Sequence, residues 1–135
     1  MLGKFPTVFA RVTGRNGVVR EYNALVNPAS ELCVIPTVDA YQLGYPEVAP
    51  SDSRIPLPNT RTFASYTGYG RGTAIKMTRV DLGAISFMDV DFVAYDIMQT
   101  LGFDLVLGRN LLRETRFGQD FASGTFRLER VGAAP

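Results

Sequence analysis

The sequence predicts an all-β, barrel-like domain with one or two short helices. Segments rich in β-branched and aromatic residues recur along the chain, turn residues separate them, and only two short segments favour helix. A chain of 135 residues is long enough for a single hydrophobic core but not for two lobes. We therefore expect one domain spanning residues 1–135, with its core at about 7–128.

The first predicted feature is a β-hairpin that ends in a tight loop. Residues 7–13 are β-branched and aromatic, which predicts a strand, and the Asn-Gly pair at 16–17 favours a type I′ turn. Residues 18–26 then return antiparallel. Pro28 lacks an N–H and restricts the preceding residue to extended conformations, so the segment 27–30 is expected to be a loop between strands.

The middle of the chain predicts short elements and an irregular excursion. The apolar run 32–35 indicates a buried strand, and 36–43 favours one or two helical turns that end at Gly44 and Pro46. Prolines at 50, 56 and 58 mark 48–60 as a loop or an edge-strand excursion.

The remaining residues predict further strands and one helix. Strands are expected at 61–66 and 73–80, joined across the glycine-rich run 68–72, which reads as a mobile hairpin tip. Residues 84–95 form one long strand or a strand pair. A buried strand at 105–107 leads through a glycine into a short helix at 109–114, and the final hairpin comprises 117–121 and 125–128.

Composition excludes several kinds of site. The chain has no histidine, which removes Ser-His and Cys-His nucleophilic pairs and histidine-containing zinc sites, so acid–base groups must be carboxylates, Lys or Tyr. We expect no metal or other cofactor. Cys33 is the single cysteine, cannot form an internal disulfide, and is expected to pack in the core.

Charge and hydropathy indicate neither a nucleic-acid nor a membrane partner. The net charge is +1, and the 14 basic residues are scattered along the chain instead of clustered. We expect no transmembrane segment and no signal peptide, which makes the cytoplasm the default location.

Four segments, taken in order, resemble the retropepsin-like aspartic proteases. An apolar strand leads into Asn27-Pro28-Ala29-Ser30, a Leu-Gly pair follows at 43–44, a glycine-rich hairpin follows at 66–72, and Val-Leu-Gly-Arg-Asn-Leu-Leu closes the series at 106–112. The resemblance covers nearly the whole chain and implies a closed acid-protease fold. It puts Asn27 at the position of the catalytic Asp.

The resemblance also implies a partner and a ligand. Aspartic protease chemistry needs two carboxylates that share a proton, and a single lobe supplies only one such loop. A homodimer is therefore implied, with residues 2–7 and 125–131 as candidates for the dimer sheet. The implied ligand is an extended polypeptide, with Ala29, Gly68, Tyr69 and Gly70 as substrate-binding residues.

Three successive residues of the loop depart from the family pattern. Asn27 is neutral, Pro28 stands where the family has Thr or Ser, and Ala29 stands where it has Gly. The chain as written is therefore expected to be inactive. One interpretation is an aspartic endopeptidase domain disabled at Asn27, by engineering or naturally; another is a naturally non-catalytic peptide-binding or dimerisation module. A third is an unrelated small β-barrel with a structural role.

One structural contact follows from the resemblance. In the family, an acidic residue four positions after the catalytic Asp pairs with the Arg of the Gly-Arg-Asn element. Glu31 and Arg109 occupy these positions. We expect a bidentate ion pair between them that fixes the loop to the helix.

Overall fold

The computed structural model describes residues 7–48, 60–65, 68–95, 104–120, 122–123 and 125–130. It is mostly β-structure with two short helices, as the sequence predicts. The elements in chain order are β1 Thr7–Thr13, β2 Val19–Val26, β3 Cys33–Ile35, α1 Thr37–Gln42, β4 Thr60–Ser65, β5 Gly68–Leu82, β6 Ile85–Ala94, β7 Leu105–Leu107, α2 Arg109–Leu112, β8 Thr115–Asp120 and β9 Thr125–Arg130. No helix among these is long and apolar enough to cross a lipid bilayer.

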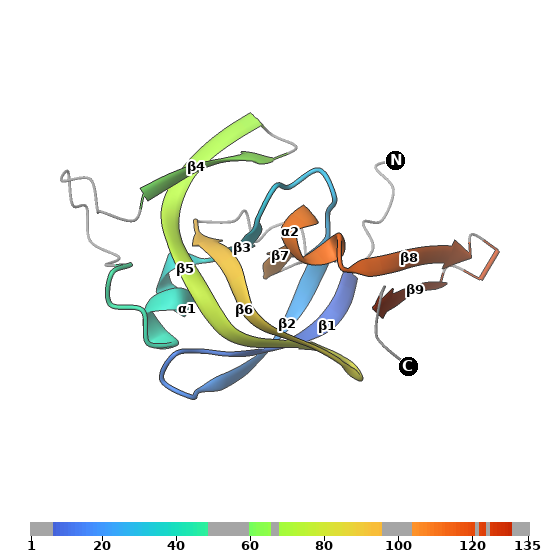
Figure 1. Cartoon of the computed structure of the whole chain (residues 1–135), viewed down its shortest axis with the longest axis horizontal. Coiled ribbons are helices and arrows are strands. Elements are labelled where there is room, and N and C mark those ends of the chain that lie inside the picture. Colours follow the sequence, from blue (N-terminus) through green and yellow to red (C-terminus); the bar gives the residue numbers. More distant parts are fainter. Residues whose placement is uncertain are drawn as a thin grey trace.

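The main sheet closes into a barrel. Its strand order is β1-β2-β7-β3-β6-β5-β4, and β1 also pairs with β5 through residues 11–13 and 79–81. The second pairing closes a ring of six strands and leaves β4 outside it, attached to β5 (Figure 1). The predicted all-β barrel is therefore confirmed.

The β2–β3 connection crosses the end of a third strand. β7 lies between β2 and β3, parallel to β2 and antiparallel to β3. The loop that leaves β2 at Val26 must therefore pass over the carboxyl end of β7 before the chain enters β3 at Cys33. With this topology the segment 27–32 packs against Gly108, the residue that follows β7.

The strands around this crossing are buried on both faces. Alternate residues of β2, including Ala24 and Val26, face the main core, whereas Leu25 packs in a smaller cluster with Val34 and Val106. Burial on both faces explains why β3 and β7 read as unbroken apolar runs and not as alternating patterns. The base of the loop is therefore rigidly packed.

The glycine-rich run forms strand and not a hairpin tip, so that prediction is wrong. Gly68, Gly70 and Gly72 belong to β5 and pair with Ser65, Phe63 and Arg61 of β4. A Cβ on Gly72 would lie 2.4 Å from the carbonyl oxygen of Ala94. Glycine is therefore needed at position 72 because the backbone of β5 lies so close to β6, and not because the chain turns there.

Other element boundaries shift slightly. Residues 85–94 form one strand, the second helix ends at Leu112, and the final hairpin is longer than expected, with β8 and β9 forming a separate two-stranded sheet. The loop expected at 48–60 lies almost entirely outside the described residues, as do residues 66–67.

Candidate functional site

The loop after β2 is a compact four-residue turn. The N–H of Asn27 donates to the carbonyl oxygen of Leu107 at 3.1 Å, and the N–H of Ser30 donates to that of Asn27 at 3.0 Å. The buried hydroxyl of Ser30 donates to the carbonyl oxygen of Leu32 at 2.7 Å. The loop predicted at 27–30 is therefore present, and hydrogen bonds fix both of its ends.

The side chain of Asn27 takes a defined orientation in this turn. Its Oδ1 accepts the backbone N–H of Ala29 at 3.1 Å. A backbone N–H can only donate, so the side-chain atom facing it must be the carbonyl oxygen, and the NH₂ group points the other way. Asn27 is half-buried, and Pro28 and Ala29 are exposed. The loop therefore presents an uncharged amide that cannot remove a proton from water.

The start of α2 supports the loop from below. The N–H of Arg109 donates to the carbonyl oxygen of Ser30 at 2.8 Å, and the N–H of Asn110 donates to that of Glu31 at 3.3 Å. A Cβ on Gly108 would lie 2.3 Å from the carbonyl oxygen of Leu32, which is closer than any real contact. The backbone of the loop can approach this closely only because residue 108 has no side chain.

Asn110 connects three elements beneath the loop, a role that the sequence did not reveal. Its Oδ1 accepts the N–H of Cys33 at 3.0 Å, and its Nδ2 donates to the carbonyl oxygen of Asp91 at 2.8 Å. One side chain thus joins α2 to β3 and β6. The available signal was its place in the Gly-Arg-Asn element, but its partners lie 77 and 19 residues away in the chain.

The ion pair expected between Glu31 and Arg109 is absent from the structure. Where side chains are described, the ion pairs join other partners: Arg11–Glu21, Arg15–Glu47, Arg20–Asp39, Lys76–Asp91 and Arg79–Asp81. The segments that carry Glu31 and Arg109 are held together by the backbone hydrogen bonds described above. These bonds perform the structural task expected of the side chains.

Cys33 is a core residue, as expected. It is free and fully buried, and the N–H of Gly108 donates to its Sγ at 3.4 Å. Burial raises the pKa of its thiol to about 12, because a thiolate would lose its hydration in this position. Cys33 is therefore not a nucleophile at ordinary pH.

The expected substrate-binding residues fall on two separate elements. Ala29 lies on the exposed loop, whereas Gly68, Tyr69 and Gly70 begin β5, with Tyr69 opposite Ala64 of β4. The β4–β5 hairpin extends beyond the closed ring of strands, and in the view of Figure 1 it rises on the same side as the β2–β3 loop.

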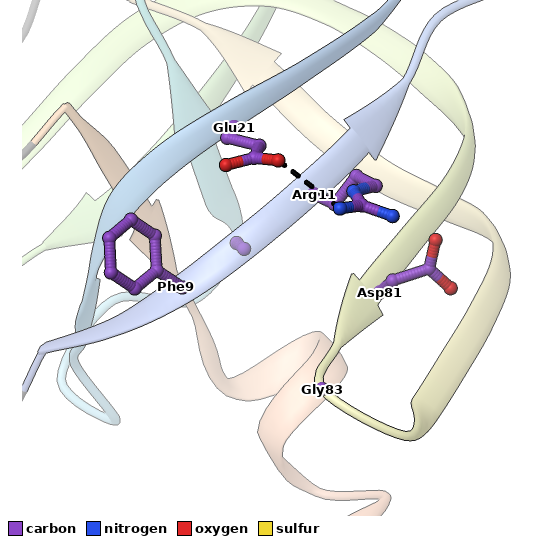
Figure 2. Close-up of a pocket in the computed structure, with 6 residues that line it drawn as sticks. Phe9, Arg11, Glu21, Asp81 and Gly83 are labelled. Atoms are coloured by element: carbon purple, nitrogen blue, oxygen red, sulfur yellow. Dashed lines mark hydrogen bonds and ion pairs between the residues drawn. The ribbon is translucent and has the colours of Figure 1, made fainter.

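A separate hollow of about 230 Å³ lies where β1 diverges from β5 (Figure 2). Figure 2 shows Arg11 between Glu21 and Asp81, with the exposed ring of Phe9 to one side. Arg11 pairs with Glu21 at 3.2 Å, and Arg79 pairs with Asp81 at 2.8 Å. Both carboxylates in this hollow therefore already have a cationic partner, and the hollow supplies no free acid or base.

Comparison with known proteins identifies the architecture. No protein-family model matches the sequence, and no curated protein matches it. A solved structure does: a retropepsin-like aspartic protease from Rickettsia conorii superposes with a TM-score of 0.50 and 19% identity, covering 84% of this chain and 75% of that one. The fold is retropepsin-like. At this identity the likeness establishes the fold and leaves the function of the Asn27 loop to be argued from its chemistry.

Proposed function

We propose that this chain is a retropepsin-like domain that binds extended polypeptide as a homodimer and does not hydrolyse it. The observation that carries the proposal is the orientation of Asn27, whose side-chain oxygen accepts the N–H of Ala29 at 3.1 Å in the loop after β2. By the resemblance of the surrounding sequence, this loop corresponds to the catalytic loop of the family. It holds an amide where the mechanism requires a carboxylate.

The absence of a carboxylate removes the chemistry of peptide hydrolysis. In an aspartic protease, two carboxylates share one proton and activate a water molecule. A carboxamide does not titrate between acidic and neutral pH, so it cannot serve as a general acid or base. General acid–base catalysis contributes a factor of about 10² to 10⁴ in rate. A dimer with two Asn27 side chains at its axis would therefore bind a peptide without cleaving it.

The β8–β9 ribbon supports a homodimer. In the part of the chain that the structure describes, these two strands pair only with each other. An isolated two-stranded ribbon is marginally stable in water, and an edge strand offers backbone N–H and C=O groups with which a further strand can pair. Pairing with the ribbon of a second copy would satisfy one edge of each. The ribbon includes residues 125–130 of the C-terminal candidate segment; residue 131 and residues 2–6 of the N-terminal candidate lie outside the described residues.

The peptide-binding residues proposed here are Ala29 on the loop and Gly68, Tyr69 and Gly70 on the β4–β5 hairpin. Because this hairpin stands outside the closed ring of strands, its backbone could hydrogen-bond to an extended chain that lies over the barrel end. A nucleic acid or membrane partner is not part of the proposal. The free, buried Cys33 fits the cytoplasmic location that we propose.

The second candidate function is an aspartic endopeptidase in which Asn27 has replaced the catalytic Asp. The support beneath the loop favours it, since the backbone bonds from Arg109 and Asn110 and the close approach at Gly108 do not depend on Asn27. An Asp at position 27 could accept the same N–H from Ala29 and leave its second oxygen towards the axis.

The test is to assay wild type, Asn27→Asp and the matched control Asn27→Ala for cleavage of an unfolded protein from acidic to neutral pH. Binding and dimer mass are measured on the same samples. We expect binding by wild type and cleavage by none of the three. Cleavage that appears only in Asn27→Asp and is blocked by a transition-state-mimicking inhibitor would favour the endopeptidase. Cleavage by wild type would contradict both candidates.

A further inference from the structure

The loop 27–30 has only one hydrogen-bond donor group that is not already used. The backbone N–H groups of residues 27, 29 and 30 donate to Leu107 O, Asn27 Oδ1 and Asn27 O respectively. Pro28 has no N–H, and the Ser30 hydroxyl donates to Leu32. The side-chain NH₂ of Asn27 remains, because no hydrogen bond from it to another described residue is present.

The position of this NH₂ group makes it available to a ligand. Asn27 is half-buried beside the exposed Pro28 and Ala29, and its carbonyl oxygen is held by Ala29. If the Asn27 amide rotated by 180°, its NH₂ group would face the Ala29 N–H. Both groups are donors, so the Ala29 N–H would lose its acceptor and the rotation is unfavourable. The loop has a fixed polarity, with an acceptor facing inward to its own backbone and a donor facing outward.

A donor that points outward favours a ligand with a hydrogen-bond acceptor. The absence of charge on the loop also allows that acceptor to be an anion. Residues 27–30 carry no charge, so nothing in the turn repels an anion as a catalytic carboxylate would. At the base of the turn, Glu31 and Arg109 carry opposite charges, which leaves the local balance neutral. Hydrogen bonds to a charged acceptor are about twice as strong as those between neutral groups.

We propose, on the basis of the homodimer described above, that the two Asn27 amides together hold a carboxylate of the bound peptide. A carboxylate has two equivalent oxygens, so one NH₂ group from each protomer can donate to each oxygen across a two-fold axis. The carboxylate is the C-terminus of an extended peptide or the side chain of an Asp or Glu within it. Only the C-terminal form is a group that peptide hydrolysis releases.

The experiment uses the immobilised full chain and the peptide mixture from an elastase digest of an unfolded protein. Half of the mixture has all its carboxyl groups converted to methylamides. Asn27→Asp is the matched variant, because it keeps an acceptor for the Ala29 N–H and replaces the donor with a charged oxygen. We expect wild type to retain the unmodified peptides about 10- to 100-fold better than the methylamides, and Asn27→Asp to lose this preference.

Each outcome decides a separate point. If wild type retains both mixtures equally, or if Asn27→Asp keeps the preference, the carboxylate inference fails while peptide binding stands. If the folded dimer retains neither mixture, the proposed function itself fails, and the carboxylate site with it. Mass spectrometry of the retained peptides separates the two sources, since a C-terminal site retains peptides that contain no Asp or Glu.

Discussion

The Asn27 loop has a tip, formed by Pro28 and Ala29, and a base, where Gly108 and Asn110 contact it. The choice of residue is restricted in different ways at the two places. At the base, Gly108 lies where a Cβ would be 2.3 Å from the Leu32 carbonyl oxygen, and Asn110 joins three elements by hydrogen bonds. At the tip, Pro28 and Ala29 are exposed. The residues at the base match the retropepsin-like sequence motif that the chain resembles, and the residues at the tip differ from it. Packing constrains the base residues, whereas the exposed tip residues are expected to change with little cost to the stability of the fold.

Gly108→Ala is expected to have the largest effect on stability. The new methyl group would collide with the backbone of the loop, which cannot move because both ends are hydrogen-bonded. We expect the free energy of unfolding to fall by about 3 kcal/mol, measured by urea denaturation. Gly83→Ala is the control: that glycine has a φ of +63° but nothing within 4 Å of the added Cβ. It should cost only about 1 to 2 kcal/mol, from backbone strain. Equal losses in the two variants would mean that the close approach at residue 108 is not the constraint.

Asn110→Ala is expected to be the next most costly change. It leaves the N–H of Cys33 without an acceptor and the carbonyl oxygen of Asp91 without this donor. We expect the same measurement to show a loss of about 2 kcal/mol. Asn16→Ala is a matched control, because Asn16 also makes one donated and one accepted side-chain bond but is exposed. It should lose less than about 1 kcal/mol, since water can replace its bonds.

Cys33 predicts an effect that is seen only at alkaline pH. The thiol has a pKa of about 12 in the folded chain, against an ordinary value of 9.0 that applies when the chain is unfolded. The unfolded state therefore releases a proton first, and the free energy of unfolding falls as the pH rises above about 9. Below that pH the thiol is protonated in both states, so Cys33 does not affect how the free energy of unfolding varies with pH. Comparison of wild type with Cys33→Ala between pH 8 and 10.5 isolates the effect, and identical slopes would contradict burial of the thiol.

The smallest stability effect is expected at the tip. The double variant Pro28→Thr, Ala29→Gly introduces, at two exposed positions, the residues of the motif that the chain resembles. We expect a loss of less than about 1 kcal/mol, mainly because the unfolded chain gains conformational freedom when the proline is removed. A loss as large as that of Gly108→Ala, in the same urea measurement, would remove the distinction between tip and base.

The sequence predicted the order of the strands well, because β-branched runs and turn residues are local signals. The prediction of a hairpin tip at 68–72 was wrong. Gly72 is required because it packs closely against Ala94, and the two residues become neighbours only when the chain folds. The position of the Asn27 loop was predictable, but the direction of its amide was not, because it depends on the N–H of Ala29. The Asn110 contacts and the missing Glu31–Arg109 pair likewise depend on side-chain directions that spacing alone does not fix.

The most direct test is a crystal structure of the dimer that locates the two Asn27 side chains. We predict that they face each other across a two-fold axis, far enough apart to admit a carboxylate between them, with Oδ1 on the Ala29 N–H and the NH₂ groups directed towards the axis. A dimer whose axis lies away from the Asn27 loops, or amides with the opposite polarity, would contradict it.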